Sequence, residues 1–173
     1  YQAHFLDAQA QQMSPGQLKS IIPDFDLIVM ATSTMSFTED ANYLLEMKKA
    51  KSTLITVLFG SHPTFMPKYC LSNDAVDIII RHEPEITLKN LVECMAQGKP
   101  YNSLKGIGFK NGSTLVINED SSLIDNLDEI PFPDVSLLPK GIHYFNPLIK
   151  RMPYITTSTS RGCPGKCTFC TAP

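Results

Sequence analysis

The amino-acid sequence predicts an α/β protein built on a doubly wound parallel sheet of the flavodoxin-like or Rossmann type. Two observations predict this class. Over the first hundred residues, short apolar runs of strand length alternate with amphipathic segments of helical period, and the loops between them are short. Such alternation is typical of parallel strands with helices on both faces of the sheet.

The first elements have readable boundaries. Residues 4–7 form a short apolar run that ends in an acid and has the length of a strand. Ser14 followed by Pro15 predicts the N-cap and first turn of a helix that continues to about residue 22. Residues 26–31 are almost wholly apolar after the leading aspartate, and they predict a buried strand.

The alternation continues through the next four elements. Residues 39–50 carry apolar side chains at helical spacing and lysines near the C-terminal end, where a helix favours positive charge. The apolar run at 52–59 predicts a strand that Gly60 ends. A short helix at 67–71 then leads to a buried strand at 76–80.

The pattern changes near Pro100. Residues 86–97 predict a helix, which the following Gly-Lys-Pro terminates. Residues 106–110 and 114–117 then alternate with period two around an Asn-Gly pair, which predicts a β-hairpin. An acidic, proline-rich connector is expected at 125–139.

The last predicted strand, residues 154–158, leads directly into a cysteine cluster. We expect three parts: an α/β domain at 1–100, a hairpin and proline-rich linker at 101–150, and the start of another domain at 151–173. The chain begins without a methionine and stops three residues after Cys170. A metal-binding loop needs support on both sides, so we expect the sequence to be a fragment of a longer protein at both ends.

Composition narrows the functional classes. The 15 basic and 17 acidic side chains give a formal charge of −2, which does not favour a nucleic-acid partner. No apolar run approaches the roughly 20 residues that span a bilayer, so no transmembrane segment is expected. Five cysteines without secretory features indicate a reducing compartment, and we expect a cytoplasmic protein. Cys70 and Cys94 stand alone in apolar helical contexts and are interpreted as core thiols.

The other three cysteines, Cys163, Cys167 and Cys170, lie within eight residues of one another. Thiolates at this spacing can hold one face of an iron–sulfur cluster, and Gly162 and Gly165 allow the backbone to turn closely around it. Three protein ligands leave one iron of a [4Fe-4S] cluster open. The alternative is a structural zinc site, which normally needs four ligands; a distant residue such as His143 would have to supply the fourth.

The segment from Arg161 to Cys170, Arg-Gly-Cys-Pro-Gly-Lys-Cys-Thr-Phe-Cys, resembles the radical S-adenosylmethionine (SAM) motif. The resemblance implies that the three cysteines hold a [4Fe-4S] cluster, that the open iron chelates SAM, and that Phe169 contacts SAM. It also implies radical chemistry on a small-molecule substrate, a reducing electron donor of the flavodoxin or ferredoxin type, and a partial (β/α) barrel that begins with the predicted strand at 154–158.

The carboxyl ends of the predicted strands are rich in small and polar residues, and doubly wound sheets bind ligands there. No glycine-rich dinucleotide or triphosphate motif is present. A large flat ligand lying over the sheet edge suits this composition. The segments that follow the strands are residues 7–9, Thr32-Ser33-Thr34-Met35, Gly60-Ser61-His62-Pro63-Thr64 and residues 81–85.

Three stretches, residues 59–64, 81–85 and 126–134, are similar to the cobalamin-dependent subfamily of radical SAM proteins. The resemblance implies that residues 32–35 and 60–64 line a cobalamin surface. His82 and Pro84 stand where that subfamily has glycines, which predicts a stiffer and bulkier loop. The Asp-x-His-x-x-Gly motif with a cobalt-ligating histidine is absent, and a purely structural role for His62 within its loop remains open.

The same alignment matches residues 4–7 to the second strand of the subfamily's sheet, so that the first strand is missing. In flavodoxin-like order the first strand lies between the second and the third. We therefore expect residues 4–7 to be misplaced, frayed or anomalously paired.

The leading hypothesis is part of a cobalamin-dependent radical SAM enzyme that cleaves SAM to start methyl transfer or oxidative cyclisation, inactive on its own. The alternative is a non-catalytic α/β module that binds a ligand or partner and carries a structural zinc site. A third reading keeps the cluster but treats the α/β domain as a scaffold without cobalamin.

Overall fold

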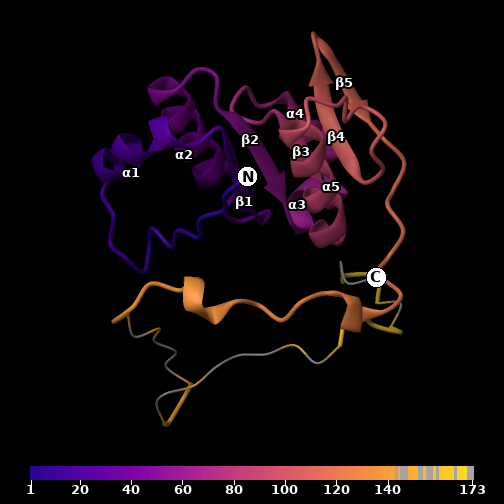
Figure 1. Cartoon of the computed structure of the whole chain (residues 1–173). Helices are drawn as coiled ribbons and strands as arrows, with labels where there is room; N and C mark the ends of the chain where they lie inside the picture. The colour runs from indigo at the N-terminus through magenta and orange to yellow at the C-terminus, as the bar shows by residue number, and fades with distance from the viewer. Residues whose placement is uncertain are drawn as a thin grey trace.

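The structure is a computed structural model that describes residues 1–142, 144, 148–151, 154, 158, 160–165 and 167–170. It confirms the predicted α/β class (Figure 1). His143 and the central residues of the predicted strand at 154–158 lie outside the described part of the chain.

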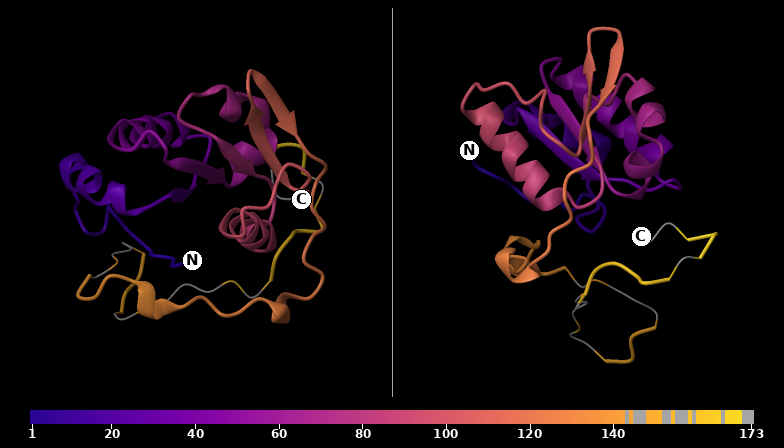
Figure 2. Two further views of the ribbon diagram at one scale, coloured as in Figure 1. Left: turned by 45° about the horizontal axis from the view of Figure 1, so that its top comes forward. Right: turned by 90° about the vertical axis from the view of Figure 1, so that its right-hand side faces the viewer.

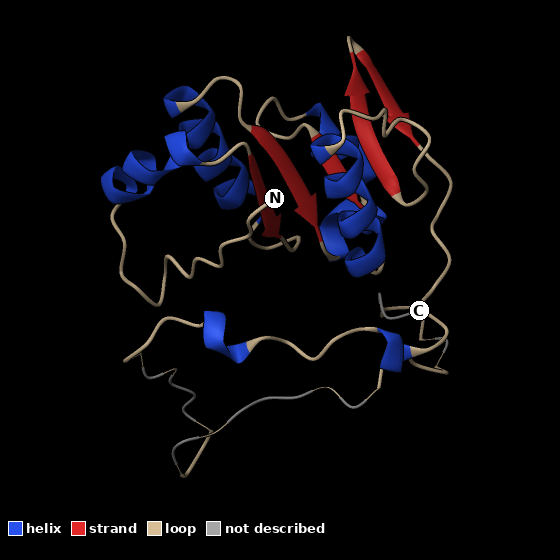
Figure 3. Ribbon diagram, in the orientation of Figure 1, coloured by secondary structure: helices blue, strands red, loops and turns tan. Residues whose placement is uncertain are grey.

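One mixed sheet of five strands forms the centre of the described structure (Figure 3). The strands are adjacent in chain order: β1 (Leu27–Ala31), β2 (Ile55–Phe59), β3 (Ile78–Ile80), β4 (Ile107–Asn111) and β5 (Thr114–Ile117). The first three are parallel, with Val57 opposite both Val29 and Ile78. The predicted hairpin, β4 and β5, joins the sheet antiparallel to β3.

Five α-helices connect or flank these strands in the described residues: α1 (Pro15–Ile21), α2 (Phe37–Ala50), α3 (Ser61–Phe65), α4 (Pro67–Ser72) and α5 (Pro84–Ala96). Three 3-10 turns follow α1 or lie in the connector: η1 (Ile22–Asp24), η2 (Leu127–Glu129) and η3 (Val135–Leu137). Among the described residues, no helix is long and apolar enough to cross a membrane.

Side chains of the strands alternate between two separate cores, one on each face of the sheet. On one face, Leu58 and Ile79 pack with side chains of α1, α2 and α4. On the other face, Val57, Ile78 and Ile80 pack with side chains of α5 and the hairpin. The two views of Figure 2 show these layers around the sheet. Helices on both faces were expected, and the structure confirms them.

Local signals explain most element boundaries. Ser14 caps α1 with a capping box, because its hydroxyl accepts from the Gln17 amide while the Gln17 side chain accepts from the Ser14 amide. Between α2 and the sheet, the Asp77 carboxylate accepts from Lys48 Nζ at 2.5 Å and from the buried Thr56 amide at 2.8 Å. This contact fixes α2 on the start of β2 and β3.

Several expected boundaries need correction. Residues 61–65 were expected as part of a loop, but they form the short helix α3. The strands expected at 52–59 and 76–80 are shorter and begin at Ile55 and Ile78, because the residues before them form turns. Of the two predicted core thiols, Cys70 is fully buried, whereas Cys94 is only half-buried.

Residues 4–7 do not form a strand, and β1 has only β2 as a neighbour in the described sheet. The expectation that these residues do not join the sheet normally is therefore confirmed. They contact other parts of the chain through side chains: the His4 ring meets Phe25 edge-on at 5.5 Å, and Asp7 accepts a hydrogen bond from Tyr144.

Candidate functional site

The carboxyl ends of β1, β2 and β3 meet at one edge of the sheet, as parallel strands require. The segments that leave these ends are residues 32–36, 60–64 and 81–85. The described residues of the C-terminal segment that contains the cysteine loop, 160–165 and 167–170, lie on the side to which the β2 arrow points (Figure 1). The predicted ligand-binding loops after β1, β2 and β3 are therefore at this edge. The prediction for residues 7–9 is wrong, because residues 4–7 form no strand that could place them there.

The loops after β1 and β2 are packed directly on each other. The Thr32 amide donates to the Phe59 carbonyl at 2.9 Å, and its hydroxyl donates to Asp40 at 2.7 Å. A Cβ atom added at Gly60 would lie 2.4 Å from the Thr32 carbonyl oxygen, and Gly60 has φ +117°. Only glycine fits both the conformation and the space. The turn at Gly60 directs the chain into α3.

His62 lies beneath this edge rather than on its surface. Its ring is only 6% exposed and stacks in a tilted arrangement on Phe37, with centroids 4.8 Å apart, while Tyr69 meets it edge-on at 5.6 Å. Nδ1 lies 3.1 Å from the Thr34 hydroxyl, and Nε2 is buried without a hydrogen-bond partner in the described structure. Through its contact with Thr34, His62 links the loop after β1 to α3, and the rings of Phe37 and Tyr69 enclose it.

The outer surface of the edge is partly apolar. Met35 is 98% exposed, and Phe65, Met66 and Tyr69 are each about half exposed. Ser61 is also exposed. Ser33 and Ser36 bond each other, with hydroxyl oxygens 3.1 Å apart and reciprocal amide contacts, so this turn is held in shape. An exposed mixture of small polar and large apolar side chains suits a ligand with a broad apolar face.

The segment after β3 is held against the connector that follows β5. Arg81 and His82 both pair with Asp120, the latter at 3.2 Å, and Arg81 also donates to the Asn118 carbonyl. His82 has φ +62°, a left-handed backbone conformation that glycine adopts more readily than any other residue. Its amide donates to the Thr64 hydroxyl at 2.9 Å. The second and third loops are thereby connected.

Two carboxylates at the start of α5 bind Arg161 from the C-terminal segment. Arg161 Nη1 donates to Glu83 at 3.2 Å and Nη2 to Glu85 at 2.5 Å. Burial by itself raises the pKa of Glu85, but the hydrogen bonds from Arg161 and from its own backbone outweigh it and leave the pKa lowered. The bond to Glu85 is in turn the main reason that the pKa of Arg161 is raised.

All three cysteines of the loop, Cys163, Cys167 and Cys170, are exposed. A Cβ atom placed on Gly165 would lie 3.3 Å from Cys163 Sγ and 3.7 Å from Cys167 Sγ, so both sulfurs approach the same glycine. The Gly165 amide contacts Cys163 Sγ at 3.4 Å. Within the described residues, no group of three or more His, Cys, Asp or Glu side chains is arranged to hold a metal ion.

These observations fit a loop that takes its final arrangement when an iron–sulfur cluster binds to it. The loop supplies thiolates, a glycine that leaves room between two sulfurs, and an amide directed at sulfur. Ligand groups commonly gather only when the metal binds. Phe169, which the motif resemblance places next to SAM, is 90% exposed on the same loop.

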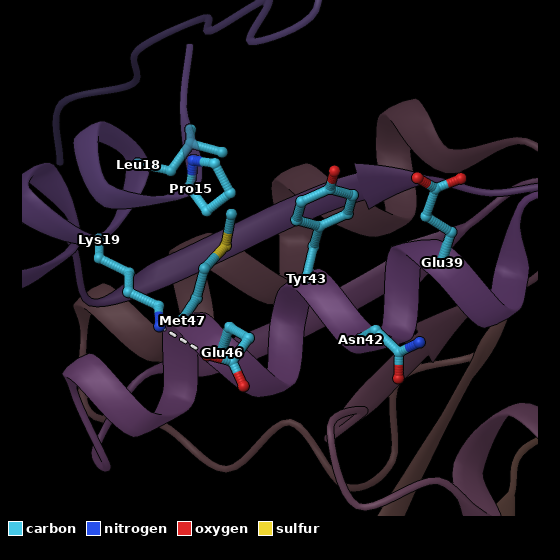
Figure 4. Close-up of a pocket in the computed structure, with 8 residues that line it drawn as sticks. All are labelled: Pro15, Leu18, Lys19, Glu39, Asn42, Tyr43, Glu46 and Met47. Carbon is cyan, nitrogen blue, oxygen red and sulfur yellow. Dashed lines mark hydrogen bonds and ion pairs between the residues drawn. The ribbon is translucent and has the colours of Figure 1, made fainter.

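Two cavities lie away from the predicted ligand residues. One, of about 270 Å³, lies between α1 and α2 and is lined by residues that include Tyr43, Glu46 and Met47 (Figure 4). Glu46 there accepts from Lys19 and Lys49, which lowers its pKa to about 2. The other, of about 630 Å³, lies between α5 and the residues around 121–130. Neither contains a residue from 32–35 or 60–64.

The sequence did not reveal the partners of these residues. The contacts of Phe37 with His62, of Asp120 with His82, and of Arg161 with Glu83 and Glu85 join distant segments, whereas Tyr69 meets His62 from the next helix, α4. The similarity of residues 81–85 to a subfamily motif was the available signal, but it did not indicate what the two glutamates bind. The fold and site define a class: an α/β domain followed by a cysteine loop that resembles the radical SAM motif.

Comparison with known proteins places the chain within this class. It is 31% identical over 170 residues to an uncharacterized methyltransferase of Pyrococcus horikoshii, covering 96% of this chain and 36% of that protein. It is 21% identical over 177 residues to the cobalamin-dependent radical SAM methyltransferase TokK of Streptomyces tokunonensis, covering 96% of this chain and 24% of TokK. No protein-family model matches the chain.

Among solved structures, the radical SAM methyltransferase TsrM from Kitasatospora setae superposes with a TM-score of 0.61 at 12% identity. The match covers 69% of this chain and 24% of TsrM. Another TsrM structure, with cobalamin and a [4Fe-4S] cluster bound, gives a TM-score of 0.58. TokK is a cobalamin-dependent radical SAM methyltransferase and TsrM is a radical SAM methyltransferase, which confirms the resemblance stated from the sequence; by its identity to the Pyrococcus horikoshii methyltransferase, the chain belongs to the same family as that protein. The chain spans about a third or less of these proteins.

Proposed function

We propose that the chain is part of a cobalamin-dependent radical SAM enzyme. The observation that carries the proposal is the arrangement of the carboxyl edge of the sheet. Three loops meet there, two of them with exposed small, polar or apolar side chains, and the segment that enters the cysteine loop is bound to the third. The similarity to radical SAM methyltransferases supports it.

Cys163, Cys167 and Cys170 would hold a [4Fe-4S] cluster. When bound, that cluster with SAM supplies the radical chemistry, for methyl transfer or oxidative cyclisation, and the protein orients the reactants and excludes water. Gly165 leaves room between two of the sulfurs and directs its amide at one of them. Phe169 has an exposed ring available to pack on the flat base of SAM.

Residues 32–35 and 60–64 would form the cobalamin surface. Met35 and Ser61 present exposed side chains at the edge, while Thr32, Gly60 and His62 hold the two loops together from below. The buried position of His62 favours its structural role over direct contact with a ligand. Such a protein would act on a small molecule in a reducing compartment, the cytoplasm, and would need a flavodoxin- or ferredoxin-type electron donor.

Anaerobic reconstitution with iron and sulfide tests the cluster. The expected result is about four irons per chain and a broad visible absorbance that changes when SAM is added. A variant with all three loop cysteines replaced by alanine is the control and should stay colourless. A colourless parent chain with one bound zinc would instead support the non-catalytic module, and the enzymatic proposal would be abandoned.

Cobalamin binding is tested separately, by gel filtration of the chain with hydroxocobalamin. We expect a coloured complex that co-elutes with the protein. Ser61→Trp places a bulky ring on the edge and should weaken binding, whereas Ser52→Trp places it before β2, at the opposite edge, and should not. Cluster formation without any cobalamin binding would support the reading in which the α/β domain is only a scaffold.

A further inference from the structure

We propose that Arg161 is a positioning residue. It binds the start of the cysteine loop to the start of α5 and so fixes the position of this loop relative to the carboxyl ends of the strands. The contact itself requires no cofactor. Its use in catalysis, to place the cluster opposite a ligand on the sheet edge, rests on the function proposed above.

The geometry of the guanidinium carries the proposal. Nη1 bonds Glu83 at 3.2 Å and Nη2 bonds Glu85 at 2.5 Å, so one side chain bridges two carboxylates that are 76 and 78 residues away in the chain. Arginine presents several donors in one rigid plane and can serve two acceptors at once. A lysine has a single ammonium group and would not reproduce this bridge.

The two acceptors lie at the start of α5, and one of them is also oriented by a second hydrogen bond. Glu83 is the N-cap residue of α5 and Glu85 lies in its first turn, where the helix favours negative charge. The second oxygen of Glu83 accepts from the Ile124 amide at 2.7 Å, which orients the carboxylate. Both glutamate side chains are two-thirds or more buried, so water screens the ion pairs less than on an open surface.

A continuous series of contacts joins Arg161 to the predicted ligand edge. Glu83 follows His82, whose amide bonds the Thr64 hydroxyl, and that hydroxyl donates to the Gly60 carbonyl at 2.8 Å. On the other side, Cys163 is two residues after Arg161, so their Cα atoms are at most about 8 Å apart. The position of the first predicted cluster ligand is therefore tied to the loop after β2.

A nitroxide attached to Cys163 tests the docking without any cofactor. The other four cysteines are replaced by serine or alanine, and the mobility of the label is read from its electron paramagnetic resonance spectrum. We expect a mostly slow label in the parent. Arg161→Gln should lower the ratio of the slow to the fast spectral component by about tenfold, and so should the double variant Glu83→Gln with Glu85→Gln. Each of these changes removes two partly screened ion pairs, whose summed contributions correspond to about that factor.

Two further variants give the result its specificity. Arg161→Lys should lie between parent and Arg161→Gln. Glu46→Gln is the matched control, because Glu46 also binds two basic side chains, on α1 and α2, and its loss should leave the label unchanged. Restoration of the slow component by combining Arg161→Glu with Glu85→Arg would support a direct pair. An equally mobile label in the parent and in Arg161→Gln would overturn the proposal.

Iron content separates this inference from the proposed function. Arg161→Gln keeps all three cysteines, so after reconstitution it should take up as much iron as the parent while its loop is more mobile. If the parent takes up no iron but its label is still immobilised through Arg161, the docking stands and the enzymatic proposal fails. If iron is bound and the label is mobile in every variant, the docking fails alone.

Discussion

The close contact between Gly60 and Thr32 predicts a large and specific loss of stability for Gly60→Ala. Gly60 has φ +117° and ψ −166°, a region that glycine alone populates to any extent. The added Cβ would lie 2.4 Å from the Thr32 carbonyl oxygen. That oxygen cannot move freely, because the Thr32 amide is bonded to the Phe59 carbonyl.

The expected magnitude has two parts. Holding a non-glycine residue in this backbone region costs about 1–3 kcal/mol. Relieving the contact by moving the Thr32 peptide would break a hydrogen bond worth about 1 kcal/mol. Gly60→Ala should therefore lower the free energy of unfolding by about 3 kcal/mol, a large share of the 5–15 kcal/mol typical of a domain.

Gly98→Ala is the matched control. Gly98 also has a positive φ, +64°, but nothing lies within 4 Å of a Cβ added there. Its cost should be only the left-handed strain of about 1 kcal/mol. Urea unfolding followed by circular dichroism measures both. Equal losses for the two variants would refute the argument, because the contact with Thr32 would then contribute nothing.

Three further predictions concern the side chains at positions 77, 70 and 82. Asp77→Ala leaves the buried Thr56 amide without its acceptor and should lower the free energy of unfolding by about 2 kcal/mol. Asp77→Asn keeps an oxygen and should lose less. Urea unfolding of the two variants measures this difference. Burial raises the pKa of Cys70 from 9.0 to about 11, so between these pH values the thiol ionises in the unfolded chain but not in the folded one, and the free energy of unfolding should fall as the pH rises. Cys70→Ala removes this component; an unchanged slope in the variant would contradict the prediction. His82→Gly should be more stable by about 1 kcal/mol than His82→Ala, because both lose the Asp120 pair but only alanine retains the left-handed strain; equal melting temperatures would count against this.

Periodicity in the sequence was sufficient for the fold class and for most of the elements. β1, β2, β3 and the hairpin are where alternation or continuous apolar runs placed them, because burial on one or both faces leaves that pattern in the chain. α3 was not anticipated. Its residues, Ser-His-Pro-Thr-Phe, are too few to display a helical period, and the helix forms because Gly60 turns the chain into it.

The candidate site was less accessible to sequence analysis. Residue type and position after a strand correctly located the loops after β1, β2 and β3 at one edge, but not residues 7–9, because residues 4–7 form no strand. They could not indicate that His62 is enclosed by Phe37 and Tyr69 instead of facing outward, since that depends on how α2 and α4 pack. The pairing of Arg161 with Glu83 and Glu85 is likewise a contact between distant segments, which no local pattern encodes.

The direction of β4 limits where a ligand can lie on this edge. Because β4 runs antiparallel to β3, its first residues stand at the carboxyl edge, and Gly106 is buried there. A Cβ on Gly106 would meet Ser121 Oγ at 2.8 Å and Thr87 Oγ1 at 3.1 Å, so the connector and α5 pack directly against the start of β4 at this point. Arg81 and Asp120 close the same side. Within the described residues, the loops after β1 and β2 carry exposed side chains at this edge whereas residues 81–85 are half-buried, so we expect a ligand of large area to lie over the loops after β1 and β2. A ligand in that position would be approached from the β3 side by the cysteine loop that Arg161 holds.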